Sequence, residues 1–147
     1  MPHGLARDLR QMVEAAEREL RALSQRDVRE PRKQGGWSKL EILGHLIDSA
    51  ANNHQRFVRV QFVDALAFPD YQQEAWVACQ DYRSREWSEL VDLWVAYNRH
   101  LAYVLDVMPV AKLDTPCRVG ESQAIPLREL VGQYMAHMRH HLAQLSA

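Results

Sequence analysis

Apolar residues recur at helical spacing in four stretches of this chain, and each stretch carries charged residues on its other face. This pattern predicts four long amphipathic helices. Ser38 precedes the second helix and forms an S-x-x-E capping box with Glu41, and Pro109 stops the third. Because no half of the chain is rich in strands, we expect an all-α fold, a four-helix bundle formed by a single domain. The predicted helices cover about residues 4–26, 38–63, 84–108 and 127–145, and the domain covers 1–147.

The connections between these helices contain residues that interrupt a helix. Residues 28–36 are polar and include a proline and two glycines, which predict a loop. Residues 71–82 predict either a short helix or an ordered crossover. In residues 109–126 the pattern changes to short β-permissive pieces, which predict a long loop or a small hairpin.

Composition and charge narrow the classes of partner. The chain carries 18 Lys and Arg residues against 19 Asp and Glu residues, and no helical face concentrates positive charge. We therefore expect no nucleic-acid partner. No apolar run approaches the ~20 residues that cross a bilayer, and the N-terminus lacks an apolar signal-peptide core, so we expect a cytoplasmic protein without membrane contact. Cys79 and Cys117 lack CxxC spacing and are expected to be reduced thiols without a role.

Three histidines lie close together in the last predicted helix. With about 100° per residue measured from Leu127, His141 falls at roughly −40°, His137 at roughly −80° and His140 at roughly −140°. His141 therefore faces inward, His137 flanks it, and His140 faces solvent. His137 and His141 also have the i, i+4 spacing that presents two imidazoles to one metal ion. The alternative is that both side chains only hydrogen-bond to their neighbours.

A polar stripe on the second predicted helix adjoins its apolar face. His45, Ser49, Asn52 and Arg56 form this stripe, at roughly −20° to −80° from Ile42. A bundle helix carries such a stripe either outward to water or inward around a ligand. The imidazole of His45 would complete a three-histidine site, which leaves a position on Zn²⁺ open for water or substrate. Such an ion lowers the pKa of bound water or binds a thiolate, so hydrolysis and thiol transfer both stay open.

Other residues give weaker signals. Asp48 is the best candidate for a carboxylate that holds His45 or His141, and an exposed charge on the helix surface is the alternative. No Asp or Glu lies clearly beside the predicted ligands as a proton-transfer group, and the chain has no P-loop, G-x-S-x-G or dinucleotide motif. The residues expected to lie outside the site are the histidines His3, His54 and His100 and the core aromatics Trp94 and Tyr97.

These motifs resemble those of the DinB/YfiT-like superfamily over most of the chain. The likeness begins at Gly35-Gly36-Trp37-Ser38, continues through residues 44–49, and ends at the H-x-x-H-H-x-x-Q pattern of residues 137–144. Two features depart from the YfiT-like pattern: Gly44 stands where a second histidine often precedes the ligand, and the third helix lacks a histidine-arginine-tryptophan motif. These departures leave the substrate undefined.

The resemblance implies a four-helix bundle, often a homodimer, that binds a divalent zinc or nickel ion. It implies either a thiol-dependent S-transferase that uses a low-molecular-weight thiol or a metal-dependent hydrolase. The substrate would be a small electrophilic molecule. The alternative function is a non-catalytic metal-binding or ligand-binding bundle in stress response. The implied metal ligands are His45, His137 and His141, and the implied substrate-binding or thiol-binding residues are Ser49, Asn52 and Arg56.

Overall fold

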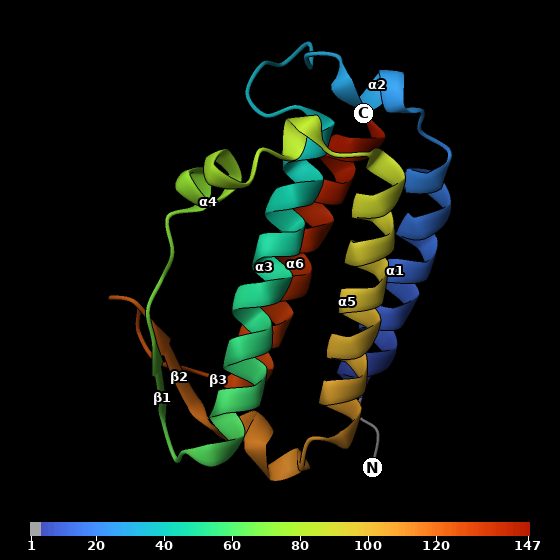
Figure 1. The fold of residues 1–147 in the computed structure, drawn as a ribbon. Coiled ribbons are helices and arrows are strands. Elements are labelled where there is room, and N and C mark those ends of the chain that lie inside the picture. The colour runs from blue at the N-terminus through green and yellow to red at the C-terminus, as the bar shows by residue number, and fades with distance from the viewer. Residues whose placement is uncertain (1–3) are drawn as a thin grey trace.

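Four long helices run alongside one another in the computed structural model, which describes residues 4–147 (Figure 1). They form the predicted all-α four-helix bundle; His3 lies outside the described residues. The bundle helices are α1 (Gly4–Arg21), α3 (Lys39–Arg59), α5 (Trp87–Val107) and α6 (Leu127–Ser146). The connecting elements are α2 (Gln25–Arg29), η1 (Val60–Phe62), β1 (Leu66–Phe68), α4 (Gln73–Gln80), η2 (Tyr82–Ser84), η3 (Val110–Asp114), β2 (Pro116–Val119) and β3 (Ile125–Pro126).

The core lies where α5 packs against both α1 and α3, while α6 packs against α3 and α1. Trp94 is fully buried there, as predicted, and Tyr97 packs against this core from a half-buried position. Within residues 4–147 no helix is long and apolar enough to cross a membrane. Cys79 and Cys117 are both free thiols, the first exposed and the second buried.

The connection after α1 differs from the prediction. α1 ends at Arg21, earlier than expected, because Ser24 starts the separate helix α2. The Ser24 hydroxyl accepts a hydrogen bond from the backbone of Asp27, whose carboxylate accepts one from Ser24 N at 3.2 Å. This is a second capping box. Val28, predicted to lie in a loop, is therefore a buried residue of α2.

Helix α3 begins at the predicted capping box. The Ser38 hydroxyl accepts a hydrogen bond from Glu41 N at 3.3 Å, and the Glu41 carboxylate accepts one from Ser38 N at 3.0 Å. Most of α3 is buried, since α5, α6 and α4 all pack against it. The buried residues include polar side chains that a bundle helix usually exposes to water.

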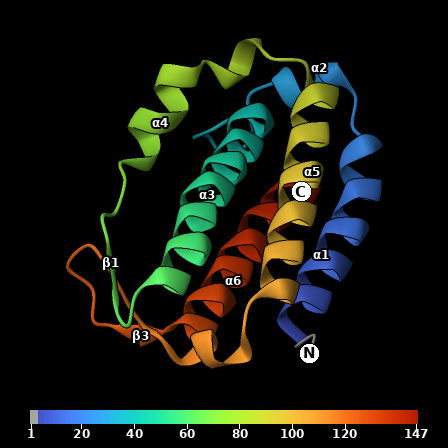
Figure 2. The same cartoon turned by 60° about the horizontal axis from the view of Figure 1, so that its bottom comes forward.

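A small three-stranded sheet lies beside the end of the bundle where α3 stops and α6 starts (Figures 1 and 2). The strand order is β1-β2-β3; β2 and β3 are antiparallel, and β1 pairs with β2 in parallel. The β2–β3 pair is the hairpin alternative predicted for residues 109–126. The pairing of β1 was not predicted, and it ties the connection after α3 to the connection before α6.

The crossover between β1 and α5 contains a short helix, α4. A short helix was one of the two alternatives predicted for residues 71–82. Tyr82 follows α4 and lies directly on α3 at Gly44. A Cβ atom added to Gly44 would stand 2.1 Å from Cδ2 of the Tyr82 ring, which no side chain tolerates. The Tyr82 hydroxyl donates to the Asp48 carboxylate at 2.7 Å, one turn further along α3. Gly44 therefore permits the crossover to cover α3 at close range.

Replacing Gly44 with alanine should lower the free energy of unfolding by about 1–3 kcal/mol, because the new methyl group must displace the Tyr82 ring. Gly132→Ala in α6 is the matched control, since a Cβ atom there meets nothing within 4 Å. That alanine should be neutral or stabilise the helix by up to ~1 kcal/mol. Urea unfolding of the metal-free protein measures both changes. Equal stabilisation by the two alanines would contradict the proposed packing.

Candidate metal centre

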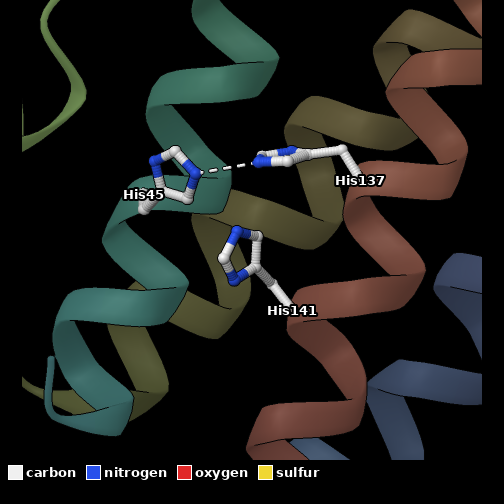
Figure 3. Close-up of side chains that lie close together, drawn as sticks. All are labelled: His45, His137 and His141. Carbon is white, nitrogen blue, oxygen red and sulfur yellow. Dashed lines mark hydrogen bonds between the residues drawn. The ribbon is translucent and has the colours of Figure 1, made fainter. Parts of the chain in front are cut away.

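Helices α3 and α6 bring three histidines together (Figure 3). His45 comes from α3 and is fully buried, whereas His137 and His141 come from α6 and are partly buried. Their candidate ligand nitrogens all lie within 4.8 Å of one another, and the Nε2 atoms of His45 and His137 are 3.0 Å apart. Figure 3 shows the three rings pointing toward a common volume between the two helices. The three residues singled out from the sequence thus converge in space.

Burial keeps all three imidazoles neutral. Desolvation, followed by repulsion from the other two histidines, lowers the pKa of His45 to about 3. Desolvation and the neighbouring His141 lower the pKa of His137 to about 4. The pKa of His141 is also lowered, chiefly by burial. At neutral pH the cluster therefore presents uncharged nitrogen donors.

This donor set fits a divalent cation. Neutral imidazole is a good ligand for zinc and for nickel. Nε2 of His45 and Nε2 of His137 are close enough to share a single proton. A cation can replace that proton between the two nitrogens, and no salt bridge has to be broken. The described residues give these rings no carboxylate partner that would instead hold them as imidazolium.

Gln144 fixes the orientation of His141. Its side-chain oxygen accepts a hydrogen bond from Nδ1 of His141 at 2.7 Å, one helical turn further along α6. Because Nδ1 then carries the proton, Nε2 of His141 keeps a free lone pair. On the other side of the cluster, the Trp37 ring packs against His45 with 5.0 Å between the ring centroids. Both neighbours belong to the sequence motifs noted above.

The other described histidines do not join the cluster. His140 is exposed, as the helical angles predicted, and its ring only borders that of His141. His54 hydrogen-bonds Tyr97 through Nδ1 at 2.9 Å and packs against His100, with 5.2 Å between the ring centroids. Among residues 4–147, the His, Cys, Asp and Glu side chains close enough together to share a metal ion are therefore the three histidines predicted from the sequence.

The predicted contact of Asp48 with a histidine was wrong, and so was its alternative as an exposed charge. Asp48 is buried, and its Oδ1 accepts hydrogen bonds from the Tyr82 hydroxyl at 2.7 Å and from Gln80 Nε2 at 2.8 Å. Desolvation raises its pKa, against the opposing effect of those two donors. Both donors come from the crossover, whose position the sequence pattern left open. Asp48 therefore anchors the crossover to α3.

A cavity of about 250 Å³ lies beside His137, between α3 and α6. Two of the predicted substrate-binding residues, Ser49 and Arg56, line it. Asn52 does not, since its amide group donates to the backbone carbonyl of Asp48 at 2.9 Å. Its neighbour Asn53 lines the cavity instead. The remaining lining residues are Asp70, Tyr71, Gln73, Val119, Ser122, Leu130, Gln133 and Tyr134.

The sequence pattern missed most of this lining. Tyr134 looked like an ordinary core residue because it lies on the apolar stripe of α6, and it is indeed buried. Its hydroxyl donates to the amide oxygen of the buried Asn98, and its ring also forms part of the cavity wall. Tyr71 and Gln73 come from the crossover, and Ser122 comes from the β2–β3 turn. The one signal for Tyr134 was its hydroxyl group, which is a polar group on an otherwise apolar stripe. Nothing in the sequence indicated the other lining residues.

Residues 8–145 of the chain match the DinB superfamily. The chain belongs to this superfamily. The match extends from α1 to α6 and includes the three clustered histidines. The resemblance drawn from the glycine, tryptophan and histidine motifs is therefore confirmed.

Two proteins similar in sequence to this DinB superfamily member are named as metal-dependent enzymes. A Geobacillus thermodenitrificans protein named "Putative metal-dependent hydrolase" is 26% identical over 138 residues, which cover 93% of this chain and 78% of the relative. A Bacillus mycoides protein, also named a "putative metal-dependent hydrolase", is 26% identical over 130 residues, which cover 88% of this chain and 75% of the relative.

A solved structure shares the fold of this DinB superfamily chain. YfiT from Bacillus subtilis superposes with a TM-score of 0.80 at 21% sequence identity, and the match covers 94% of this chain and 82% of YfiT. YfiT is described as "a probable metal-dependent hydrolase with an unusual four-helix bundle topology". At this level of identity the match shows the shared bundle topology.

The metal-free protein should lose stability as the pH falls from 6.5 toward about 4. A histidine in the unfolded chain titrates near 6.5, whereas the folded protein lowers the pKa of His45 to about 3 and that of His137 to about 4. The unfolded chain therefore binds protons that the folded protein excludes. The free energy of unfolding should fall by up to roughly 1.4 kcal/mol per pH unit for each such histidine.

Urea unfolding at successive pH values measures this slope. His137→Gln should reduce the change of unfolding free energy with pH, because the unfolded chain then binds one proton fewer than in the wild type. The same substitution at the exposed His140 controls for the loss of a histidine from α6. A slope that His137→Gln leaves unchanged would rule out a neutral buried cluster.

Proposed function

We propose that this DinB superfamily protein is a metal-dependent hydrolase of a small molecule, with a zinc or nickel ion held by His45, His137 and His141. One observation carries the proposal: three neutral imidazoles converge beside a cavity of about 250 Å³. Three protein ligands leave a coordination position for reacting groups, as in catalytic zinc sites. The names of the Geobacillus and Bacillus relatives, both "putative metal-dependent hydrolase", support the same reaction class.

The chain's own residues have separate roles in this proposal. The three histidines hold the ion, which when bound would act as a Lewis acid and lower the pKa of a bound water or thiol. Gln144 keeps Nδ1 of His141 protonated and so presents Nε2 as the ligand atom. Ser49 and Arg56 line the cavity and would orient the substrate. Asn52 instead braces α3 through its bond to the backbone.

Thiol transfer is the second candidate, and the position of the carboxylates favours it. Asp48 is held by Tyr82 and Gln80, and Asp70 is exposed to solvent where it lines the cavity. Oδ2 of Asp48 is buried without a hydrogen-bond partner, yet Asp48 does not line the cavity, so among residues 4–147 the cavity has no buried carboxylate to act as a general base. A base assists the attack of water even on a metal ion, whereas a thiol is deprotonated outright when it binds the metal. A low-molecular-weight thiol would therefore suit this site.

Purified wild-type protein should contain close to one equivalent of zinc or nickel per chain. His45→Ala and His141→Ala should each lose the ion, because two remaining imidazoles hold it far more weakly. His140→Ala should keep it, since that side chain lies outside the cluster. Elemental analysis after reconstitution and desalting measures the content. Wild-type protein without metal above background would contradict the proposal.

The reaction itself is tested with the metal-loaded protein. Hydrolysis predicts turnover of simple esters or amides without a thiol, and thiol transfer predicts turnover of electrophiles only when a thiol is added. Either activity should disappear in His141→Ala and persist in His140→Ala. Metal binding without any turnover would favour the non-catalytic bundle instead.

Gln144→Ala should weaken metal binding by about 10–100-fold, because the Nδ1 proton of His141 loses its acceptor and the ring loses its orientation. Gln144→Glu should largely preserve the affinity, since a carboxylate accepts the same hydrogen bond. Competition with a zinc indicator measures the dissociation constant of each variant. Equal losses in the two variants would contradict the role of the Gln144 side-chain oxygen as the acceptor for His141.

A further inference from the structure

Arg56 is the most deeply buried charge that faces the cavity. Its side chain is only 7% exposed, and no described acidic residue forms an ion pair with it. Within residues 4–147, eight ion pairs join other charged residues at the surface, so the isolation of Arg56 is an exception. A guanidinium stays charged even when it is buried, and it then requires an acceptor for its N–H groups.

The guanidinium is held by contacts that leave one of its edges free. Nη1 donates to the side-chain oxygen of Asn53 at 3.4 Å, and Cζ lies 5.4 Å from the centroid of the Phe68 ring. Both partners are uncharged. Nε is buried without a hydrogen-bond partner, and no bond from Nη2 to a described residue is present. Nε and Nη2 together form the edge that binds a carboxylate through two parallel hydrogen bonds.

We propose that Arg56 is the anion-binding group of this cavity and that the substrate carries a carboxylate group that pairs with its free Nε/Nη2 edge. This inference rests on the proposed function, because it places the reacting end of the same molecule at the three histidines. His137 and Arg56 line the same cavity, so one small molecule can reach both.

The charge around the cavity favours a single negative charge on the ligand. Asp70 also lines the cavity, from an exposed position near Tyr71, and its charge acts on Arg56. The only other cavity groups in the described chain are neutral amides, hydroxyls, an imidazole and apolar side chains. The single guanidinium balances the one negative charge of a carboxylate. A phosphate dianion would carry a second, unbalanced charge next to Asp70.

The dimensions favour a short molecule. His45 and Arg56 are three turns apart on α3, so their Cα atoms are separated by about 16 Å at a rise of 1.5 Å per residue. His137 and Arg56 both line the cavity between α3 and α6. The cavity volume of about 250 Å³ is below the usual range for drug-sized ligands. The expected substrate is therefore a compact carboxylic acid whose electrophilic group lies a few bonds from the carboxylate.

The anion site is tested first on the metal-free protein. In ¹⁵N-labelled wild type, the Nε–H signal of Arg56 is followed by NMR during titration with propionate and, separately, with propionamide. Propionate should shift this signal saturably before the exposed arginines respond, and propionamide should not. An Arg56 signal that propionate leaves in place, or that moves only with the exposed arginines, would overturn the proposal. This measurement needs neither a metal nor a variant.

The link to the metal centre is tested on the cobalt-loaded protein. Binding of 3-mercaptopropionate and of 3-mercaptopropionamide is measured through the thiolate-to-cobalt absorption band. The acid should bind about tenfold more tightly than the amide, because its carboxylate gains a charge-assisted pair. Arg56→Gln should reduce this preference to near unity, and Arg56→Lys should retain only part of it. An acid that binds no better than the amide in the wild type would overturn the inference.

Two further variants separate the outcomes. Arg59→Gln, one turn beyond Arg56 on the exposed side of α3, is the matched control and should keep the full preference for the acid. Asp70→Asn should increase the affinity for the acid about twofold to threefold and leave the affinity for the amide unchanged, because a repelling charge is removed.

If the amide binds cobalt but the acid has no advantage, the anion site fails and the metal proposal survives. If propionate moves Arg56 but no thiolate band forms, the metal proposal fails and the anion site survives.

Discussion

Three imidazoles occupy one small volume between α3 and α6, and much of the surrounding structure follows from that contact. Each imidazolium would lose its hydration and repel the other two, so the cluster is compatible with folding only while the rings are neutral. The helical repeat of α6 keeps His137 and His141 one turn apart. The third ring depends on the register of α3 against α6, which the whole bundle core determines.

The turn of α3 that carries His45 is also covered closely by the crossover, at Gly44 and Asp48. The absence of a side chain at Gly44 lets the Tyr82 ring lie on the helix backbone, directly before the histidine in sequence. Asp48 then fixes the Tyr82 hydroxyl one turn later. A larger residue at position 44 would lift the crossover and admit water along the same side of α3. The glycine, the tyrosine and the carboxylate therefore hold the crossover against this turn of α3.

Periodicity made the helices and the histidine cluster predictable, since both depend on positions within one helix. The Ser38 capping box and the inward direction of His141 follow from local geometry alone. The early end of α1 had a local signal too, but Ser24 is paired with an aspartate rather than the glutamate that usually marks such a box. By contrast, the partner of Asp48 lies 34 residues away along the chain, and no periodic pattern specifies a contact of that kind.

The choice between Asn52 and Asn53 shows where prediction from one helix stops. Both residues are buried, and they point about 100° apart around α3. Which of the two faces the cavity depends on the segments that pack against each side of α3. Those segments are the crossover and the sheet. The parallel pairing of β1 with β2 joins these two connections, so the cavity walls at Tyr71 and Ser122 are set by contacts that are distant in sequence.

The three clustered histidines and the cavity walls are thus built from different parts of the fold. The three histidines are fixed by helix packing, where a change in backbone position disturbs the whole core. Tyr71, Gln73 and Ser122 lie in or next to connections, which tolerate changes in sequence and length more readily. Arg56 belongs to the helical part, so a positive charge in the cavity is as firmly placed as the histidines themselves. The bundle therefore places the three histidines and the guanidinium, and the connections shape the rest of the cavity.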